Sequence, residues 1–147
     1  MLFAAYVVAL FLQVTSPTKP DAPQELAARV PDKGDLDCTK KKYSFVSPGS
    51  TTVLFMVTCD TVEPYLEGYR VRLSVGNPFR AAFSDVTGEV HYGDSPMAAI
   101  DQKVVLPVVP RLSPGLWTRL EVVIPRASAK DVRYLYLSGV SVKTARD

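Results

Sequence analysis

The residues with the most distinctive chemistry in this sequence are its two cysteines, Cys38 and Cys59. An even number of cysteines fits a disulfide, and it fits two free thiols equally well. Pro48 and Gly49 lie midway between them, so a hairpin centred on that pair would place the cysteines directly opposite each other on neighbouring strands. We therefore expect a disulfide, which for a loop of this size would stabilise the fold by about 3 kcal/mol. The alternative is two buried thiols in a protein that is not exported.

A catalytic constellation is not recognisable in the remaining residues. His91 is the only histidine, and one histidine with two cysteines cannot fill a tetrahedral metal site without carboxylates. We expect His91 to point outward, beside Glu89, as a surface residue. Asp85, Thr87 and Glu89 share one face of a predicted strand, but spacing alone does not make an acid–base pair. With neither a Gly-x-Ser-x-Gly motif nor a phosphate-binding glycine loop, the sequence predicts no catalytic residue, no metal and no cofactor.

Basic and aromatic residues supply the candidate binding surface, which consists of Arg70, Arg72 and Trp117. The two arginines share one face of a predicted strand, where anionic headgroups or cell-wall polymers could bind or water could solvate them. Trp117 begins another predicted strand and could equally well cap one end of a sheet. The lysine run 40–42 divides between two strand faces, which is typical of an edge strand protected against aggregation. A net charge of +2, without an aromatic and basic platform, argues against nucleic acid.

The elements that position these residues are short strands with a period of two. In the clearest example, Val71, Leu73 and Val75 point to one face while Arg70 and Arg72 point to the other. Turn signals rich in proline and glycine separate the strands, and these residues number 12 and 8 in the chain. The predicted strands cover residues 38–46, 51–62, 67–75, 83–92, 103–109, 116–124 and 132–142. About seven such strands predict an all-β, immunoglobulin-like or fibronectin-like sandwich, with a small barrel as the alternative.

Irregular positions are also predicted within these strands. Pro107 places its strand at a sheet edge, because proline cannot donate a hydrogen bond to a ladder. Gly88 could mark a bulge, and a second bulge is expected near Gly139, where the parity of the apolar residues changes.

The N-terminal residues 2–12 form an unbroken apolar run. The run is too short to span a membrane, which takes about 20 residues, but it has the length of a signal-peptide core. No lysine or arginine precedes it, so an uncleaved anchor, a misassigned start, or a buried strand or helix are alternatives. We divide the chain into a signal peptide or short anchor (1–16), a linker (17–36) and a β-sandwich domain (37–147). Residues 2–14 could associate with a membrane, but without a cysteine near residue 16 we expect no lipid attachment there.

One stretch of sequence resembles a known family. The motif Val62-Glu63-Pro64-Tyr65-Leu66-Glu67-Gly68-Tyr69, followed by Gly76-Asn77-Pro78, is similar to an uncharacterised family of bacterial envelope lipoproteins, a domain of unknown function. Weaker similarities at 88–93, 114–117 and 131–137 extend the match to about residues 43–142. The resemblance implies a periplasm-facing β-sandwich without known catalytic activity, and it carries over no functional residues. Members of the family commonly begin with a lipidated cysteine, which this sequence lacks.

These observations together predict a non-catalytic domain of the bacterial cell envelope. We expect it to be periplasmic, or anchored in the membrane and facing the periplasm, and to bind an envelope protein or a cell-wall component. One alternative is a structural accessory subunit of an envelope complex. Another is an enzyme whose site, near His91 or Asp85, sequence patterns do not reveal.

Overall fold

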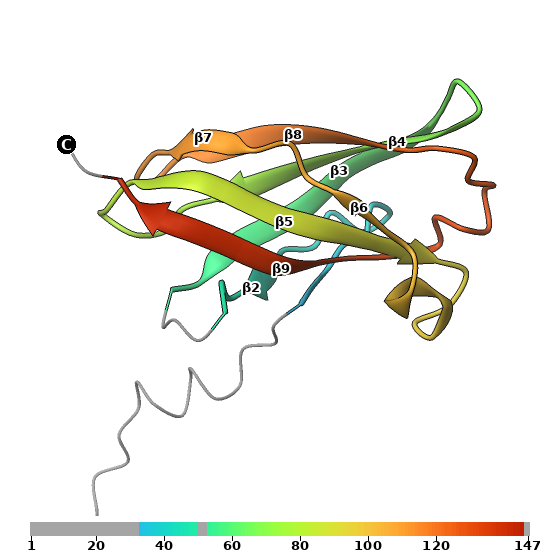
Figure 1. Ribbon diagram of the computed structural model, residues 1–147, viewed down its shortest axis with the longest axis horizontal. Helices are drawn as coiled ribbons and strands as arrows, with labels where there is room; N and C mark the ends of the chain where they lie inside the picture. The colour runs from blue at the N-terminus through green and yellow to red at the C-terminus, as the bar shows by residue number, and fades with distance from the viewer. Residues whose placement is uncertain (1–32, 50–52, 146–147) are drawn as a thin grey trace, which may run out of the picture.

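The computed structural model describes residues 33–49 and 53–145, which form two antiparallel sheets packed face to face (Figure 1). One sheet has the strand order β1-β9-β5-β6, with β7 also paired to β5, and the other has the order β2-β3-β4-β8. The strands are β1 (Gly34–Asp35), β2 (Ser44–Val46), β3 (Phe55–Tyr65), β4 (Gly68–Gly76), β5 (Phe83–Gly93), β6 (Lys103–Val105), β7 (Val109–Leu112), β8 (Trp117–Ile124) and β9 (Tyr134–Thr144), and one 3-10 turn, η1 (Ala98–Ile100), precedes β6. The predicted two-sheet sandwich is therefore confirmed.

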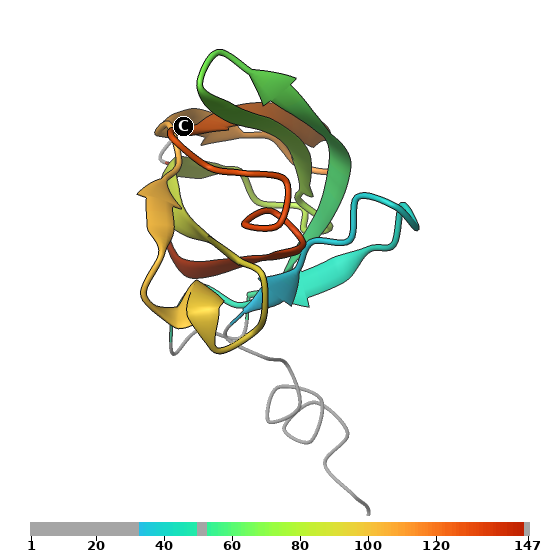
Figure 2. The ribbon, with the colours of Figure 1, turned by 90° about the vertical axis from the view of Figure 1, so that its right-hand side faces the viewer.

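Two crossings of the chain connect the sheets at their sides. On one side β1 pairs with β9 in the first sheet, and the chain then crosses so that β2 pairs with β3 in the second. On the other side β7 pairs with β5, and after the turn at Gly115 β8 pairs with β4. Viewed end-on, the two sheets and their crossings enclose the core (Figure 2).

The core follows the alternation of apolar and polar residues along the strands. In β4 the side chains of Val71, Leu73 and Val75 are buried between the sheets, while Arg70 and Arg72 lie on the outer face, as predicted. The same alternation places Phe55, Val57 and Cys59 of β3, Val122 and Ile124 of β8, and Leu135, Leu137 and Val140 of β9 in one continuous core. Burial of apolar side chains on a period of two is what fixes the register of each strand.

The described residues contain nine strands where about seven were predicted. One addition is the short β1, so the sandwich begins by Gly34, within the stretch predicted as a linker. The other comes from Pro107, which interrupts its predicted strand and separates β6 from β7. Both pieces pair with β5 at one edge of the sheet, so the edge position predicted from the proline is confirmed.

Three bulges shift the strand registers. The bulge predicted near Gly139 is present: β9 carries an extra residue opposite β5, and Gly139 has φ +59°. A second extra residue lies in β5 at Asp85, which has φ +49°. The third is Asp60 in β3, opposite β4. Gly88 is not itself the extra residue, but a Cβ there would lie only 3.2 Å from the side chains of Leu106 and Leu137.

The predicted hairpin centred on Pro48-Gly49 is wrong in register. Ser44 pairs with Val57 and Val46 with Phe55, which moves the centre of the hairpin about two residues along the chain. Cys38 therefore does not lie on a strand opposite Cys59, and residues 38–41 form a turn before β2. The run of lysines belongs mostly to this turn and not to an edge strand. The cause is a loop longer than the two-residue turn that the arithmetic assumed, since Pro-Gly is not a favoured two-residue hairpin turn.

The predicted signal or anchor segment, residues 1–16, and the linker up to residue 32 lie outside the described residues. Among the residues that are described, no helix is long and apolar enough to cross a membrane.

Candidate binding face

The outer surface of the β2-β3-β4-β8 sheet, which we call the open face, gathers the predicted binding residues. Strand pairing arranges its side chains in rows that run across the sheet. The first row contains Phe45, Met56, Gly76 and Trp117. The second contains Thr58, Ser74 and Arg119, and the third contains Thr61, Arg72 and Glu121. The fourth contains Glu63, Arg70 and Val123. All three predicted binding residues are thus on one surface, with Trp117 at one end and the arginines nearer the other.

The two arginines form a charge network with two glutamates. Arg70 Nε donates to Glu63 Oε1 at 2.8 Å, and Arg70 Nη1 lies 3.6 Å from Glu121 Oε1. Arg72 reaches the same carboxylates, with Nη2 at 3.3 Å from Glu63 and Nε at 3.2 Å from Glu121. Arg70 also lies over the ring of Tyr65, 4.6 Å from its centroid.

Glu63 and Glu121 neutralise Arg70 and Arg72, the two arginines that the sequence suggested as an anion-binding site. Hydrogen bonding to Glu63 raises the pKa of the Arg70 guanidinium above its ordinary value, with the charge of Glu121 contributing. Two cations opposite two anions leave no net charge at this position. A ligand that paired with Arg70 or Arg72 would have to displace a carboxylate that is already bound, so these two residues are a poor anion site.

Trp117 lies beside Gly76 at the opposite end of the open face. A Cβ built on Gly76 would be 3.0–3.1 Å from three neighbouring atoms of the indole ring, so the ring rests on this glycine through its face. The side chain of Trp117 is 44% exposed, and that of Tyr43, just before β2, is 56% exposed. Their ring centroids are 5.5 Å apart with 34° between the planes. The two rings form an aromatic surface that is open to solvent.

A groove of about 740 Å³ runs across the open face between the aromatic pair and the charge network. It is lined by Lys41, Tyr43, Thr58, Asp60, Thr61, Arg72, Arg119, Leu120 and Glu121. Among the described residues neither Lys41 nor Arg119 has an acidic partner, in contrast to Arg72. The cations available on this face are therefore two residues that the sequence did not single out.

Asp60 reaches the groove because it directly follows Cys59, which is buried in the core, so alternation turns its side chain to the outer face. The bulge in β3 then places the next residue, Thr61, on the same face. Ser74 donates its hydroxyl hydrogen to Asp60 Oδ2 at 2.7 Å. The groove thus holds hydroxyl groups and a carboxylate beside its cations, and it can both donate and accept hydrogen bonds.

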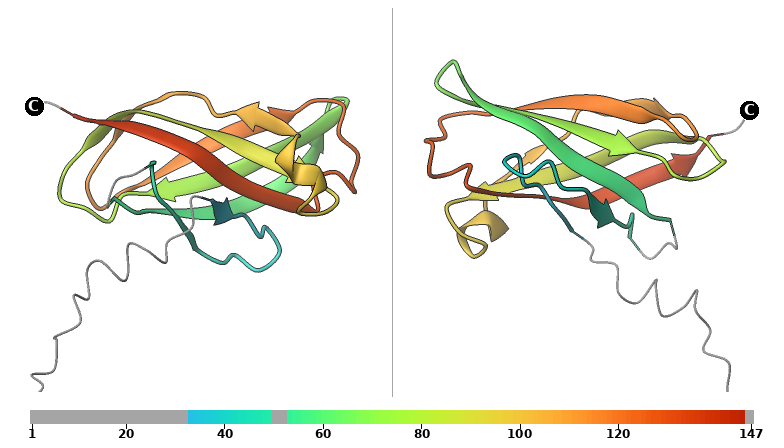
Figure 3. Two further views of the ribbon diagram at one scale, coloured as in Figure 1. Left: turned by 60° about the horizontal axis from the view of Figure 1, so that its bottom comes forward. Right: turned by 180° about the vertical axis from the view of Figure 1, so that it is seen from behind.

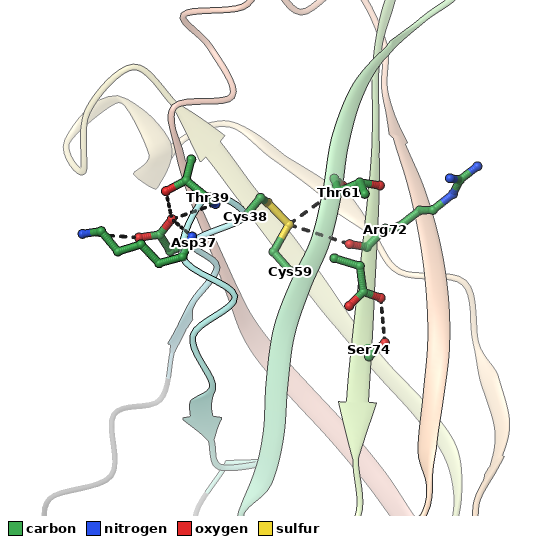
Figure 4. Close-up of a disulfide and its surroundings, with 9 residues drawn as sticks. Asp37, Cys38, Thr39, Cys59, Thr61, Arg72 and Ser74 are labelled. Atoms are coloured by element: carbon green, nitrogen blue, oxygen red, sulfur yellow. Dashed lines mark hydrogen bonds and ion pairs between the residues drawn. A yellow bond between two sulfur atoms is a disulfide. The ribbon is translucent and has the colours of Figure 1, made fainter.

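A disulfide joins Cys38 to Cys59 and fixes the chain beside the groove (Figure 4). The Cα atoms are 4.6 Å apart, and the cysteines are 21 residues apart in sequence. Cys59 lies in β3, while Cys38 belongs to the crossing between β1 and β2. The same turn is held by Asp37, whose carboxylate accepts hydrogen bonds from the hydroxyl and amide of Thr39, and these bonds lower its pKa. Because Lys41 and Tyr43 follow this turn, the disulfide helps to hold two groove residues in place.

His91 is not the surface residue that the strand pattern predicted. It does point to the outer side of its sheet, beside Glu89, but η1 covers it and only 8% of the residue is exposed. Its Nδ1 lies 2.9 Å from the carbonyl oxygen of Ala99 in η1, and its ring stacks on Tyr136 with centroids 4.5 Å apart. Glu89 Oε2 is 3.7 Å from Nε2 of His91, and Lys103 binds both carboxylate oxygens of Glu89 at 2.8 and 3.0 Å. We call this region the covered face.

The Glu89 carboxylate is held in its ionised form by these neighbours. The hydrogen bond from Lys103, more than any other contact, lowers the pKa of Glu89 below its ordinary value, and burial opposes this shift. Neither Asp85 nor Thr87 joins this cluster: Lys143 pairs with Asp85 at 3.0 Å, beyond the bulge in β5. In residues 33–49 and 53–145 no group of three or more His, Cys, Asp or Glu side chains could hold a metal ion.

Sequence reasoning singled out Trp117 but not the residues that line the groove beside it. Lys41 was hidden in a lysine run that was interpreted as a strand, and Arg119 lies on the same face as Trp117, two positions further along β8. This spacing of two residues was the sequence signal that could have placed Arg119 beside Trp117. Tyr43 and Thr61 could not have been found, because a crossing and a bulge bring them to this face.

Comparisons with known proteins give matches in structure alone. No family model matches the chain, and no curated protein is significantly similar to it. Among solved structures, the trimeric lipoprotein SadB of Salmonella enterica superposes with a TM-score of 0.65 at 18% identity, over 86% of this chain and 69% of that one. The uncharacterized lipoprotein YajI of Escherichia coli superposes with a TM-score of 0.52 at 10% identity, over 98% of this chain and 90% of the other. At these identities the similarity establishes a shared fold.

Proposed function

We propose that this chain is a non-catalytic domain of the bacterial cell envelope that faces the periplasm and binds an envelope protein or a cell-wall component. The observation that carries the proposal is the disulfide between Cys38 and Cys59. Disulfides form and persist in oxidising compartments such as the periplasm, and they are rare in the cytosol. An exported protein gains from this bond, because it stabilises the fold where chaperones and reductants of the cytosol are absent.

Two further observations support an envelope location. Both solved structures named above are bacterial lipoproteins by name. The apolar run at residues 2–12 has the length of a signal-peptide core, and residues 2–14 could alternatively hold the domain at the membrane. The domain itself would then project into the periplasm.

The binding role is supported by the contrast within the open face. A groove there combines two cations that lack acidic partners with the exposed ring of Tyr43, and the exposed ring of Trp117 lies beside it. Exposed aromatic and basic side chains gathered in one concave place are typical of recognition surfaces. A purely structural sheet face would bury or pair these groups, as the covered face does.

The location is tested by expressing the full chain with a C-terminal tag in a Gram-negative host and fractionating the cells. We expect the protein in the periplasmic or membrane fraction, and its cysteines should resist a maleimide–polyethylene glycol reagent until they are reduced. The double variant Cys38→Ser/Cys59→Ser gives the unlabelled reference. A cytosolic protein with thiols that react before reduction would overturn the proposal.

A second candidate function is a structural subunit of an envelope assembly. The observation that favours it is the description of SadB as trimeric. Size-exclusion chromatography with light scattering on the exported protein decides between the two. A stable trimer at micromolar concentration supports the structural role, and a monomer at all concentrations contradicts it.

A further inference from the structure

Trp117 presents one face of its indole ring to solvent. Its other face rests on Gly76, where the missing side chain lets the ring lie flat against the sheet. Covering a glycine in this way is a known structural use of aromatic residues in sheets. That use explains the covered half of the ring. It does not explain why Trp117 is 44% exposed beside a second aromatic residue, Tyr43, that is more exposed still.

The groove beside the two rings has an excess of positive charge. Arg72 and Glu121 neutralise each other across it, which leaves Lys41 and Arg119 against the single carboxylate of Asp60. That carboxylate already accepts a hydrogen bond from Ser74. An occupant with one negative charge would therefore complement the groove, and a cation would not.

The other lining groups restrict the chemistry of the occupant further. The walls carry the hydroxyl groups of Thr58, Thr61 and Tyr43, and Leu120 is their only aliphatic side chain. A ligand must therefore offer many hydrogen-bonding groups on one side and a flat C–H surface for the aromatic rings on another. Pyranose sugars have this shape, since the axial C–H bonds on one face of the ring pack onto the electron-rich face of an aromatic side chain.

We propose that this groove binds a carboxylated saccharide of the cell wall, with one sugar ring stacked on Trp117 and Tyr43 and the carboxylate paired with Lys41 and Arg119. The inference rests on the proposed envelope function and names the ligand class and the site. A groove of about 740 Å³ lies in the range of small-ligand sites and has room for a disaccharide. Asp60, Thr58 and Thr61 would bind its hydroxyl groups.

The chain offers an internal probe, because Trp117 is its only tryptophan. Its fluorescence can be followed while the disulfide-bonded protein is titrated with the disaccharide of N-acetylglucosamine and N-acetylmuramic acid. The matched probe is N,N′-diacetylchitobiose, which differs in lacking the lactyl ether group that carries the carboxylate. We expect a saturable change with the acidic disaccharide and binding at least about tenfold weaker with the neutral one, because the charge-assisted hydrogen bonds to the carboxylate are lost.

Variants assign the ligand to the groove. Arg119→Gln and Lys41→Gln should each weaken binding of the acidic disaccharide by about tenfold and leave the neutral one unchanged. Arg80→Gln removes an exposed arginine outside the groove and should change neither. All three side chains lie at the surface, so unchanged circular dichroism and thermal midpoints are expected and identify any variant that has lost its fold.

Three outcomes would overturn the inference. The first is no fluorescence change with the acidic disaccharide up to millimolar concentration, and the second is equal affinity for both disaccharides. The third is binding of an acidic peptide of the same charge in place of the sugar, which would assign the groove to a protein partner. If any of these outcomes is found for a protein that is periplasmic and disulfide-bonded, the saccharide site is contradicted but the proposed envelope function is not. A protein that is cytosolic and reduced would contradict the envelope function as well.

Discussion

The two outer faces of this sandwich use the same kinds of residue with opposite results. The covered face stacks His91 on Tyr136, and Lys33 lies 5.1 Å above the same tyrosine ring. On the open face the ring of Tyr43 lies beside that of Trp117 with 34° between the planes. Yet Tyr136 is 7% exposed and Tyr43 is 56% exposed.

The difference comes from what the chain places above each pair of rings. On the covered face the 3-10 turn η1 follows β5, and the carbonyl of its Ala99 binds His91. No comparable segment of the described chain lies over Trp117. The cations differ in the same way, because Lys103 is paired with Glu89 while Arg119 has no acidic partner among the described residues. One face is completed by the protein itself, and the other is left open to solvent.

The two faces also differ in how they are attached to the rest of the fold. The edge of the open face depends on the crossing before β2, which the disulfide fixes to β3. The covered face is built on β5 and β9, which pair along most of their length. The β3–β4 hairpin extends the sheet of the open face beyond the rest of the sandwich (Figure 3). Local loosening should therefore begin on the open side.

The largest effect is expected from removing the disulfide. Replacing Cys38 and Cys59 by alanine should lower the free energy of unfolding by about 3 kcal/mol, because the unfolded chain regains the freedom of the closed loop. Urea unfolding at neutral pH measures the loss against the disulfide-bonded wild-type protein, and the reduced wild-type protein should resemble the variant. Hydrogen exchange should quicken in β2 and the preceding turn while β5 and β9 keep their protection. A uniform change over both sheets would refute the asymmetry.

A second prediction compares how much the aromatic pair of each face contributes to stability. His91→Ala should cost about 2 kcal/mol, because it opens a cavity under η1 and leaves the Ala99 carbonyl without its partner. Trp117→Ala removes a larger but half-exposed ring and should cost about 1 kcal/mol or less. Thermal and urea unfolding of the two variants give the comparison. If the tryptophan variant proves the less stable, Trp117 serves the fold more than a ligand.

A third, smaller effect depends on pH and belongs to the covered face. Since the folded-state pKa of Glu89 is lowered, chiefly by the hydrogen bond from Lys103, its contribution to stability is full above its ordinary pKa of 4.5 and is lost as pH falls through the folded value. Lys103→Met should therefore destabilise the protein by less than about 1 kcal/mol at pH 7.

The difference between the Lys103→Met variant and the wild type should then shrink as the pH is lowered from 5 towards 3. Unfolding curves across this range test it. Lys143→Met, which breaks a more exposed pair with Asp85, is the matched control and should have a smaller effect. A gap between Lys103→Met and wild type that is constant with pH would show that Glu89 does not carry the effect.

The smallest effect is expected at the tip of the protruding hairpin. Leu66 is 87% exposed and has φ +51°, a conformation that costs energy for leucine and that asparagine tolerates better. Leu66→Asn should raise the free energy of unfolding by about 0.5 kcal/mol. Glu67→Asn, at the neighbouring exposed position without a positive φ, should bring no gain. A destabilised Leu66→Asn protein would mean that the leucine packs against something in solution.

Sequence patterns predicted the strands well where alternation was long and regular. The positions of Val71, Leu73 and Val75 in the core, the edge at Pro107 and the bulge near Gly139 all follow from local rules of pleating and hydrogen bonding. The failures lie where distant parts of the chain meet. His91 was expected at the surface because no residue in its own strand indicates that η1 folds back over it.

The sequence by itself determined an all-β fold, because a period of two in apolar residues buries one face of each strand, and it determined that Trp117 and Arg119 share a face. Only the tertiary structure decided which cations are neutralised and which remain available. Arg70 and Arg72 meet Glu63 and Glu121 through strand pairing, and Lys41 reaches the groove through a disulfide-bound turn. Charge balance and access depend on distances between strands, and these are set when the sheets assemble.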